Sequence, residues 1–253
     1  MPIDVDRYLE RIRVEGPVGV DLDSLARLQR AHMTWVAFEN LDVFHRVGVT
    51  VDPISNVAKI VDRGRGGWCF EVNGAFAELL TSIGFHVRLL GAAVLLDGPN
   101  DVVDHLTLEV RLDDSFLVDV GFGESFWRPL RLNTDAVQDG GAGQFALFPS
   151  PKGTTLTSVA ADGGLVPQYR FKRVSLTMAD FEAASQRLQS AAGGHWVDKP
   201  FATRLIDGGP RRVTLLKDRL KLHDGTDVQT VPVSADEWST ELDRWFHMRT
   251  ESF

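Results

Sequence analysis

The sequence predicts an α+β protein in which helices come first and short strands follow. Apolar residues recur at helical spacing through the first third of the 253-residue chain. After Gly84 the pattern changes to short runs rich in β-branched and aromatic residues, separated by turn residues. Residues 235–246 return to a helical pattern that points Leu242 and Trp245 inward. The chain shows no internal repeat.

The first third contains four or five short helices, which indicates a helical bundle. Acidic residues precede or open most of them, and a glycine closes the last one. The expected helices are one capped by Asp4 or Asp6 that runs through Tyr8 and Ile12, residues 21–30, residues 56–61 opened by Pro53, and residues 69–83 closed by Gly84.

The middle of the chain predicts a small antiparallel sheet or barrel, because its strand-like runs are short. Turn residues at 97–100 and 113–114 separate several of these runs, and residues 140–143 and 191–194 are expected to be loops. The expected strands are 87–90, 92–96, 106–112, 116–120, 145–148, 165–171 and 212–216.

Composition excludes several classes of function. The formal net charge of −8 opposes a general nucleic-acid or acidic-membrane surface, although a local arginine or lysine cluster could still bind an anion. A single cysteine excludes an internal disulfide and a cysteine-rich zinc site, so we expect no metal and a reducing compartment. The acidic N-terminus differs from a signal peptide, and no window approaches about 18 uninterrupted apolar residues. We therefore expect a cytoplasmic protein.

Cys69 is the strongest candidate for a nucleophile. It follows a glycine-rich turn at residues 64–67 and stands where a helical pattern begins. Unpaired backbone N–H groups and the positive end of the helix dipole favour a thiolate there. The alternative is a small buried hydrophobe, which is what most free cysteines are. No Gly-Lys-Ser/Thr follows the turn, so a phosphate loop is not indicated.

A nucleophilic cysteine needs a base and a group that orients this base. His105 is the best placed of seven histidines, because it opens a strand on the face opposite its apolar residues. Asp119 interrupts an apolar strand, where a carboxylate is costly unless it is paired. A tight hairpin at 113–115 would place Glu109 opposite Asp119 and leave His105 four residues further, roughly 13 Å away. A bulge, a strong twist or another strand must then bring His105 and Asp119 together.

Five segments of the chain resemble the arylamine N-acetyltransferase family. They are residues 37–42 (AFENLD), 65–73 (RGGWCFEVN), 84–87 (GFHV), 105–110 (HLTLEV) and 118–123 (VDVGFG). The cysteine, histidine and aspartate motifs stand in the family's order, which makes the signal specific. The resemblance covers most of the chain but weakens after about residue 150. Ala37 replaces the family's usual proline, and Ala93 stands where an arginine is common.

The resemblance implies a fold and a chemistry. Cys69 would accept the acyl group, His105 would act as the base, and Asp119 would orient His105. Acetyl-CoA would be the acetyl donor, and an aromatic amine or hydrazine the acceptor, in a ping-pong double displacement. Around this cysteine-protease-like Cys-His-Asp core, the implied segments are a helical bundle over 1–84, a central antiparallel β-barrel over 85–190 and a C-terminal α/β lid over 191–253.

Neighbouring residues are expected to support this site. The resemblance suggests that Arg65 pairs with Glu39 and buttresses the turn before Cys69. Gly121 and Gly123 would give the backbone room beside the thiol. An aromatic acceptor pocket would be lined by Phe38, Trp68, Phe122 and Gly123, and for each of the three aromatic residues plain core is the alternative.

Three other functions stay open on the sequence. An amide synthase of the same family would use the same triad to close a macrolactam on a carrier-bound acyl chain. A cysteine peptidase or transglutaminase-like hydrolase would cleave amides without CoA. A catalytically silent binding module would carry an unreactive Cys69.

Overall fold

Helices form the first third of the chain, as the sequence predicts. The computed structural model describes residues 3–190, 195–225 and 227–249. The helices of this part are α1 (Val5–Arg11), α2 (Leu22–Trp35), α3 (Leu41–Phe44), α4 (Pro53–Val61) and α5 (Cys69–Ile83). The side chains of Asp4, Asp21 and Asp52 each accept a backbone N–H in the first turn of α1, α2 and α4. Gly84 ends α5 in the left-handed region, with φ of 116°.

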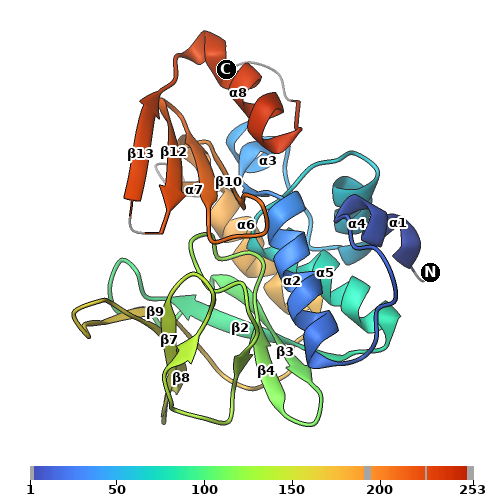
Figure 1. The fold of residues 1–253 in the computed structure, drawn as a ribbon, viewed down its shortest axis with the longest axis vertical. Helices are drawn as coiled ribbons and strands as arrows, with labels where there is room; N and C mark the ends of the chain where they lie inside the picture. The colour runs from blue at the N-terminus through green and yellow to red at the C-terminus, as the bar shows by residue number, and fades with distance from the viewer. Residues whose placement is uncertain (1–2, 191–194, 226, 250–253) are drawn as a thin grey trace.

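Eight strands of the described residues form one antiparallel sheet that nearly closes into a barrel (Figure 1). They are β2 (His86–Val94), β3 (His105–Arg111), β4 (Ser115–Val118), β5 (Leu130–Arg131), β6 (Gln138–Asp139), β7 (Gln144–Ser150), β8 (Gly153–Val159) and β9 (Leu165–Phe171). Their order is β5-β4-β3-β2-β9-β8-β7-β6. The Gln138 side chain links the two edge strands through hydrogen bonds of 2.8 and 3.0 Å with the Arg131 backbone. The two expected strands 87–90 and 92–96 are one strand, because Gly91 continues the ladder opposite Leu106.

A second sheet covers the other side of the molecule (Figure 1). Its strands, in spatial order, are β1 (Phe38–Glu39), β10 (Phe201–Leu205), β11 (Arg212–Leu216), β12 (Arg219–Asp224) and β13 (Asp227–Pro232). Pairing of Phe38 with Thr203 joins a segment from the first third of the chain to this sheet. Trp238 and Leu242 of α8 (Ala235–Phe246) pack on Val213 and Leu215.

Three further elements connect the barrel to this second sheet: η1 (Met178–Phe181), α6 (Glu182–Ser190) and α7 (His195–Asp198). Sequence patterns did not predict them, nor β1, α3, β5, β6, β8, β10, β12 and β13. The loop expected at 191–194 lies outside the described residues. The division of the chain at residues 84 and 190 stays a prediction.

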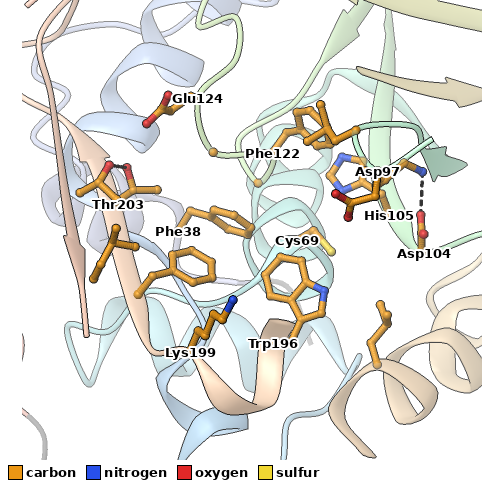
Figure 2. Close-up of a pocket in the computed structure, with 18 of the residues that line it drawn as sticks. Phe38, Cys69, Asp97, Asp104, His105, Phe122, Glu124, Trp196, Lys199 and Thr203 are labelled. Atoms are coloured by element: carbon orange, nitrogen blue, oxygen red, sulfur yellow. Dashed lines mark hydrogen bonds between the residues drawn. The ribbon is translucent and has the colours of Figure 1, made fainter. Parts of the chain in front are cut away.

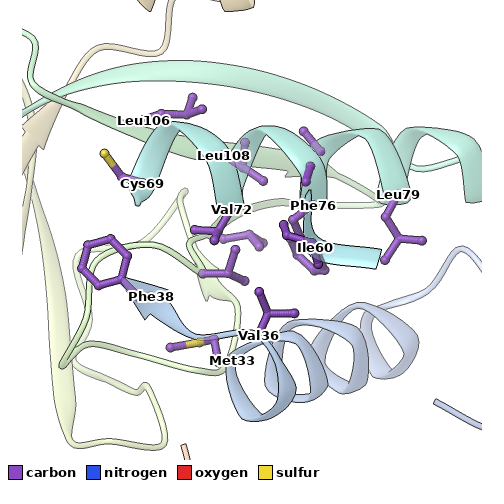
Figure 3. Close-up of a cluster of buried hydrophobic side chains, with 14 of the residues drawn as sticks. Met33, Val36, Phe38, Ile60, Cys69, Val72, Phe76, Leu79, Leu106 and Leu108 are labelled. Atoms are coloured by element: carbon purple, nitrogen blue, oxygen red, sulfur yellow. The ribbon is translucent and has the colours of Figure 1, made fainter. Parts of the chain in front are cut away.

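The main hydrophobic core lies between the helices and the outer face of the barrel (Figure 3). Val72 and Phe76 of α5 pack against Leu106 and Leu108 of β3. These two leucines alternate along β3 with residues that face the barrel interior. One face of the strand therefore packs in the main core and the other face packs inside the barrel. This packing places the N-terminus of α5 beside the start of β3. Across the described residues, no helix is long and apolar enough to cross a membrane.

Candidate active site

Two glycines let the turn before α5 approach its neighbours closely. A Cβ atom on Gly66 would lie 2.0 Å from the carbonyl oxygen of Ala37. A Cβ atom on Gly67 would lie 2.7 Å from a carboxylate oxygen of Glu71. That carboxylate accepts the backbone N–H of Trp68 at 3.1 Å. The two glycines therefore let the backbone pass close to Ala37 and Glu71 just before α5, which begins at Cys69.

The Cys69 thiol and the His105 imidazole meet where α5 and β3 begin. Both residues are 2% exposed, and the Cys69 side chain lies near enough to His105 to raise the pKa of the imidazole. Figure 2 shows them on the same wall of a pocket. Nε2 of His105 lies 2.6 Å from Oδ2 of Asp119, which leaves Nδ1 as the ring nitrogen that faces the sulfur. The structure therefore brings together the three residues expected to form a triad.

The charges of this cluster support one another. Burial lowers the pKa of His105, but the Asp119 carboxylate and the Cys69 side chain outweigh burial and raise the pKa. Burial raises the pKa of Asp119, and the hydrogen bonds from His105 and Asn73 and the His105 charge outweigh it and lower the pKa. The imidazole can therefore take up and hold a proton at neutral pH, beside a carboxylate that stays charged.

Asp119 is held by four hydrogen bonds. Besides His105, its carboxylate accepts the Asn73 side-chain amide and the Gly121 backbone N–H, both at 2.9 Å, and the Tyr169 hydroxyl at 3.1 Å. The sequence pattern did not point to Tyr169, which comes from a strand 50 residues away. Asn73 could have been found, because it stands four residues after Cys69 and therefore on the same helix face.

The hairpin register predicted for β3 and β4 is wrong. Glu109 pairs with Leu117 rather than lying opposite Asp119, because the turn closes at Arg111 and Ser115. This shift of two residues leaves Asp119 just beyond the last paired residue, Val118. His105 is then two positions from Asp119, roughly 7 Å along the strand, a gap that converging side chains can bridge. Neither a bulge nor another strand is needed.

A buried group of charged residues supports the turn before Cys69. Arg65 donates hydrogen bonds to Glu39 at 2.8 and 3.2 Å, which is the expected pair, and also contacts Asp42 at 2.9 Å. Lys59, which was not expected here, lies 2.8 Å from both Asp42 and Glu71. Burial raises the pKa of Glu71 to about 7, against the opposing charge of Lys59. These ion pairs tie α3, α4, α5 and β1 to one turn.

A pocket of about 910 Å³ opens between the barrel and the second sheet (Figure 2). Cys69 and His105 lie in its wall together with the expected residues Phe38, Phe122 and Gly123. Gly121 also lines the pocket, and a Cβ atom there would lie 2.9 Å from Cα of Cys69. The absence of a side chain at Gly121 therefore leaves room beside Cys69, as expected.

Four residues of this region either differ from the sequence-based expectation or were missed by it. Trp68 is fully buried and does not line the pocket, because its ring packs edge-on against Phe70 and Trp196 beneath the surface. Gly123 has φ of 84°, so its turn needs glycine for backbone conformation rather than for space. Trp196 and Phe201 line the pocket but come from the part of the chain where the motifs are weakest.

Within the described residues, no three His, Cys, Asp or Glu side chains gather as metal ligands.

A buried cysteine beside a histidine–aspartate pair, at the wall of a pocket, is the arrangement expected of a cysteine-dependent acyltransferase or hydrolase. A family model described as N-acetyltransferase matches residues 21–252. The arylamine N-acetyltransferase of Mycolicibacterium smegmatis is 34% identical over 78% of this chain and 74% of the relative. The arylamine N-acetyltransferase / N-hydroxyarylamine O-acetyltransferase of Salmonella typhimurium is 30% identical over 89% and 82%.

Solved structures agree with these sequence matches. The Mycobacterium marinum arylamine N-acetyltransferase in complex with CoA superposes with a TM-score of 0.89 at 29% identity, over 97% of this chain and 93% of that one. The chain belongs to the arylamine N-acetyltransferase family. The expected fold class, a helical bundle, an antiparallel β-barrel and a C-terminal α/β part, is confirmed.

Proposed function

We propose that this protein transfers an acetyl group from acetyl-CoA to aromatic amines or hydrazines by a ping-pong mechanism through acetyl-Cys69. One observation carries the proposal: a buried thiol at the start of α5 lies beside a His105–Asp119 pair and opens to a large pocket. Family membership supports the same chemistry, and a relative is known in complex with CoA.

The first half-reaction forms the acyl-enzyme. His105 takes the proton of the Cys69 thiol, and the thiolate attacks the thioester carbonyl of acetyl-CoA. Asp119 stabilises the imidazolium that results. The backbone N–H of Cys69, in the first turn of α5, is a natural donor to the oxyanion. When the tetrahedral intermediate collapses, the carbon–sulfur bond to CoA breaks, and His105 returns its proton to the leaving thiolate.

The second half-reaction uses the same groups on the acceptor. The neutral amine attacks the carbonyl of acetyl-Cys69, and His105 accepts the proton that the amine nitrogen loses. Collapse breaks the bond between the acetyl carbon and Sγ of Cys69, and the proton on His105 restores the thiol. Each half-reaction ends with the histidine ready for the other, which is the basis of ping-pong kinetics.

The pocket walls suggest how an aromatic acceptor is held. Phe38 packs against Phe201 and Trp196 with ring centroids 5.3 and 5.9 Å apart, and the group faces the pocket that contains Cys69. On the opposite side, Phe122 packs on His105 at 5.0 Å. A planar ring between these walls would gain stacking and edge contacts. We propose Phe38, Phe122 and Gly123 as acceptor contacts, whereas Trp68 is buried away from the pocket and is not one of them.

A two-step mass experiment tests the proposal. Mixing the protein with acetyl-CoA should add one acetyl group to Cys69, and an aromatic amine should then remove it as the acetylated amine. Cys69→Ser provides the control that cannot form a thioester. An adduct on another residue, or transfer without an adduct, would contradict the mechanism.

The same assay separates this reaction from an amide synthase. If Cys69 stays unmodified by acetyl-CoA but accepts an acyl chain from a carrier-protein thioester, the protein is an amide synthase and the proposed acetyl transfer is wrong. We also propose a cytoplasmic setting, because a catalytic thiol that must stay free is best kept in a reducing compartment.

A further inference from the structure

A second pocket lies away from the catalytic one, where the α1–α2 connection and the end of α2 meet the β10–β11 turn. Its volume is about 270 Å³, and among the described residues it shares no lining residue with the catalytic pocket. Arg13, Arg27 and Arg30 line it together with Trp35. The chain carries a net charge of −8, so a gathering of arginines at one place needs a cause.

These three arginines keep donors that nothing in the protein uses. The guanidinium carbon of Arg13 lies over the Trp35 ring, 3.8 Å from the ring centroid. Within the described part of the chain, neither Arg13 nor Arg30 makes a side-chain hydrogen bond or ion pair. Arg27 donates from Nη2 to the Pro17 carbonyl, but its Nε is buried without a partner. Of these donors only the Arg27 Nε is buried, where an unpaired donor is costly, whereas Arg13 and Arg30 are exposed and keep their donors free for a ligand.

Two more arginines beneath the pocket add to its positive charge. Arg11 donates to the Trp35 carbonyl at 2.6 Å, and Arg204 donates to the Thr34 carbonyl at 2.6 Å, so both serve the C-terminal end of α2. Burial lowers the pKa of both guanidinium groups, and the charge of Arg13 lowers each pKa further. Like charges are therefore crowded here, and a bound anion would relieve their repulsion.

The acidic residues at the pocket do not balance these cations. Glu15 and Asp207 are the carboxylates in the lining of the described pocket. Asp207 already pairs with Arg211, at 3.2 Å. Asp21, outside the lining, also feels the charge of Arg27. Against three lining arginines and the two beneath, these three carboxylates still leave an excess of positive charge.

We propose that this arginine pocket (Arg13, Arg27, Arg30 and Trp35) binds the phosphate group of a small phosphorylated molecule. Guanidinium groups match phosphate oxygens with pairs of charge-assisted hydrogen bonds. The volume lies just below the roughly 300 Å³ at which drug-sized pockets begin, so it fits a phosphate with a small organic group.

Calorimetric titration at constant ionic strength tests the proposal on CoA-free protein. Inorganic phosphate and phenyl phosphate are the two probes, and they distinguish a site for free phosphate from one for a phosphate ester. We expect saturable binding of at least one probe. Arg13→Gln and Arg30→Gln should each weaken it by about tenfold or more, because each removes a charged donor.

Two matched variants locate the binding. Arg111→Gln removes an exposed arginine from β3, outside both pockets, and Lys199→Gln removes a cation from the catalytic pocket. Both should leave the probe's affinity unchanged. In addition, the probe should raise the midpoint of thermal unfolding of the wild type and not of Arg30→Gln. Absence of binding by both probes, binding that survives both arginine-pocket variants, or binding lost in Lys199→Gln would overturn the proposal.

Discussion

Replacing Asp119 with asparagine changes one atom of the site and reverses the protonation of His105. The asparagine oxygen can keep the hydrogen bonds from Asn73 and the Gly121 N–H, both at 2.9 Å. The amide nitrogen would then face Nε2 of His105, at the place where the carboxylate oxygen now lies 2.6 Å away. Since an amide NH₂ group can only donate, Nε2 must accept, and the ring proton moves to Nδ1. Nδ1 faces the thiol, so the ring can no longer take its proton.

The expected loss in acylation rate is large. The variant lacks both the correct tautomer and the negative charge that stabilises the imidazolium, a combination that lowers rates by about 10⁴-fold in serine enzymes with this arrangement. That factor corresponds to about 5 kcal/mol of barrier at 1.36 kcal/mol per tenfold. Binding of acetyl-CoA should change little, because Asp119 is 1% exposed and does not line the pocket.

Rapid-quench mixing with acetyl-CoA, followed by intact mass measurement of the acetyl-enzyme, gives the acylation rate directly. Tyr169→Phe serves as the matched control, because it removes one hydrogen bond to the same carboxylate oxygen and keeps the charge. It should cost far less than Asp119→Asn. An acylation rate for Asp119→Asn within tenfold of the wild type would refute the role assigned to this carboxylate.

Three further predictions concern support and pH. Arg65→Met should lower the free energy of unfolding by about 3–5 kcal/mol in urea titrations, because it leaves Glu39 buried without its main partner; an unchanged midpoint would contradict this. Gly121→Ala should slow acylation while the protein stays folded, since the new Cβ would lie 2.9 Å from Cα of Cys69; a wild-type rate would show that the backbone can yield. The raised pKa of His105 stabilises the fold fully below its unfolded value of 6.5, and this contribution is lost as the pH rises toward about 10. The stability difference between wild type and His105→Gln should therefore shrink over that range in denaturant titrations, and a constant difference would contradict it.

Local signals predicted much of the fold. The first helices follow from aspartate caps and apolar spacing, and Gly84 and the helix at 235–246 were correct to the residue. The strand β13 was missed because its residues are exposed and lack a clear apolar alternation. The strand β12 was missed although Leu220 and Leu222 alternate with polar residues, because the alternation covers only a few residues. The two-residue strand β1 was missed because only its partner β10, which is distant in sequence, makes it a strand.

The site was predictable where its chemistry is local and not where it depends on register. Cys69 stands out because a glycine turn meets a helix start, and the Arg65–Glu39 pair is observed as expected. The contact between His105 and Asp119 could not be derived, because a shift of two residues in one hairpin decides it. The expected position of Trp68 in the pocket wall is not observed. The sequence alone does not show whether an aromatic residue next to a nucleophile faces the pocket or the core. Tyr169 carries no local signal, since only the strand order of the barrel brings it to Asp119.

The fate of the acetyl group on Cys69 tests the proposed mechanism most directly. After mixing with acetyl-CoA and removal of free CoA, the intact mass should rise by one acetyl group, and peptide mapping should place it on Cys69. Addition of an aromatic amine should return the protein to its original mass and yield one equivalent of the acetylated amine. A stable adduct that the amine does not remove, or an adduct that persists in Cys69→Ser, would contradict transfer through this thiol.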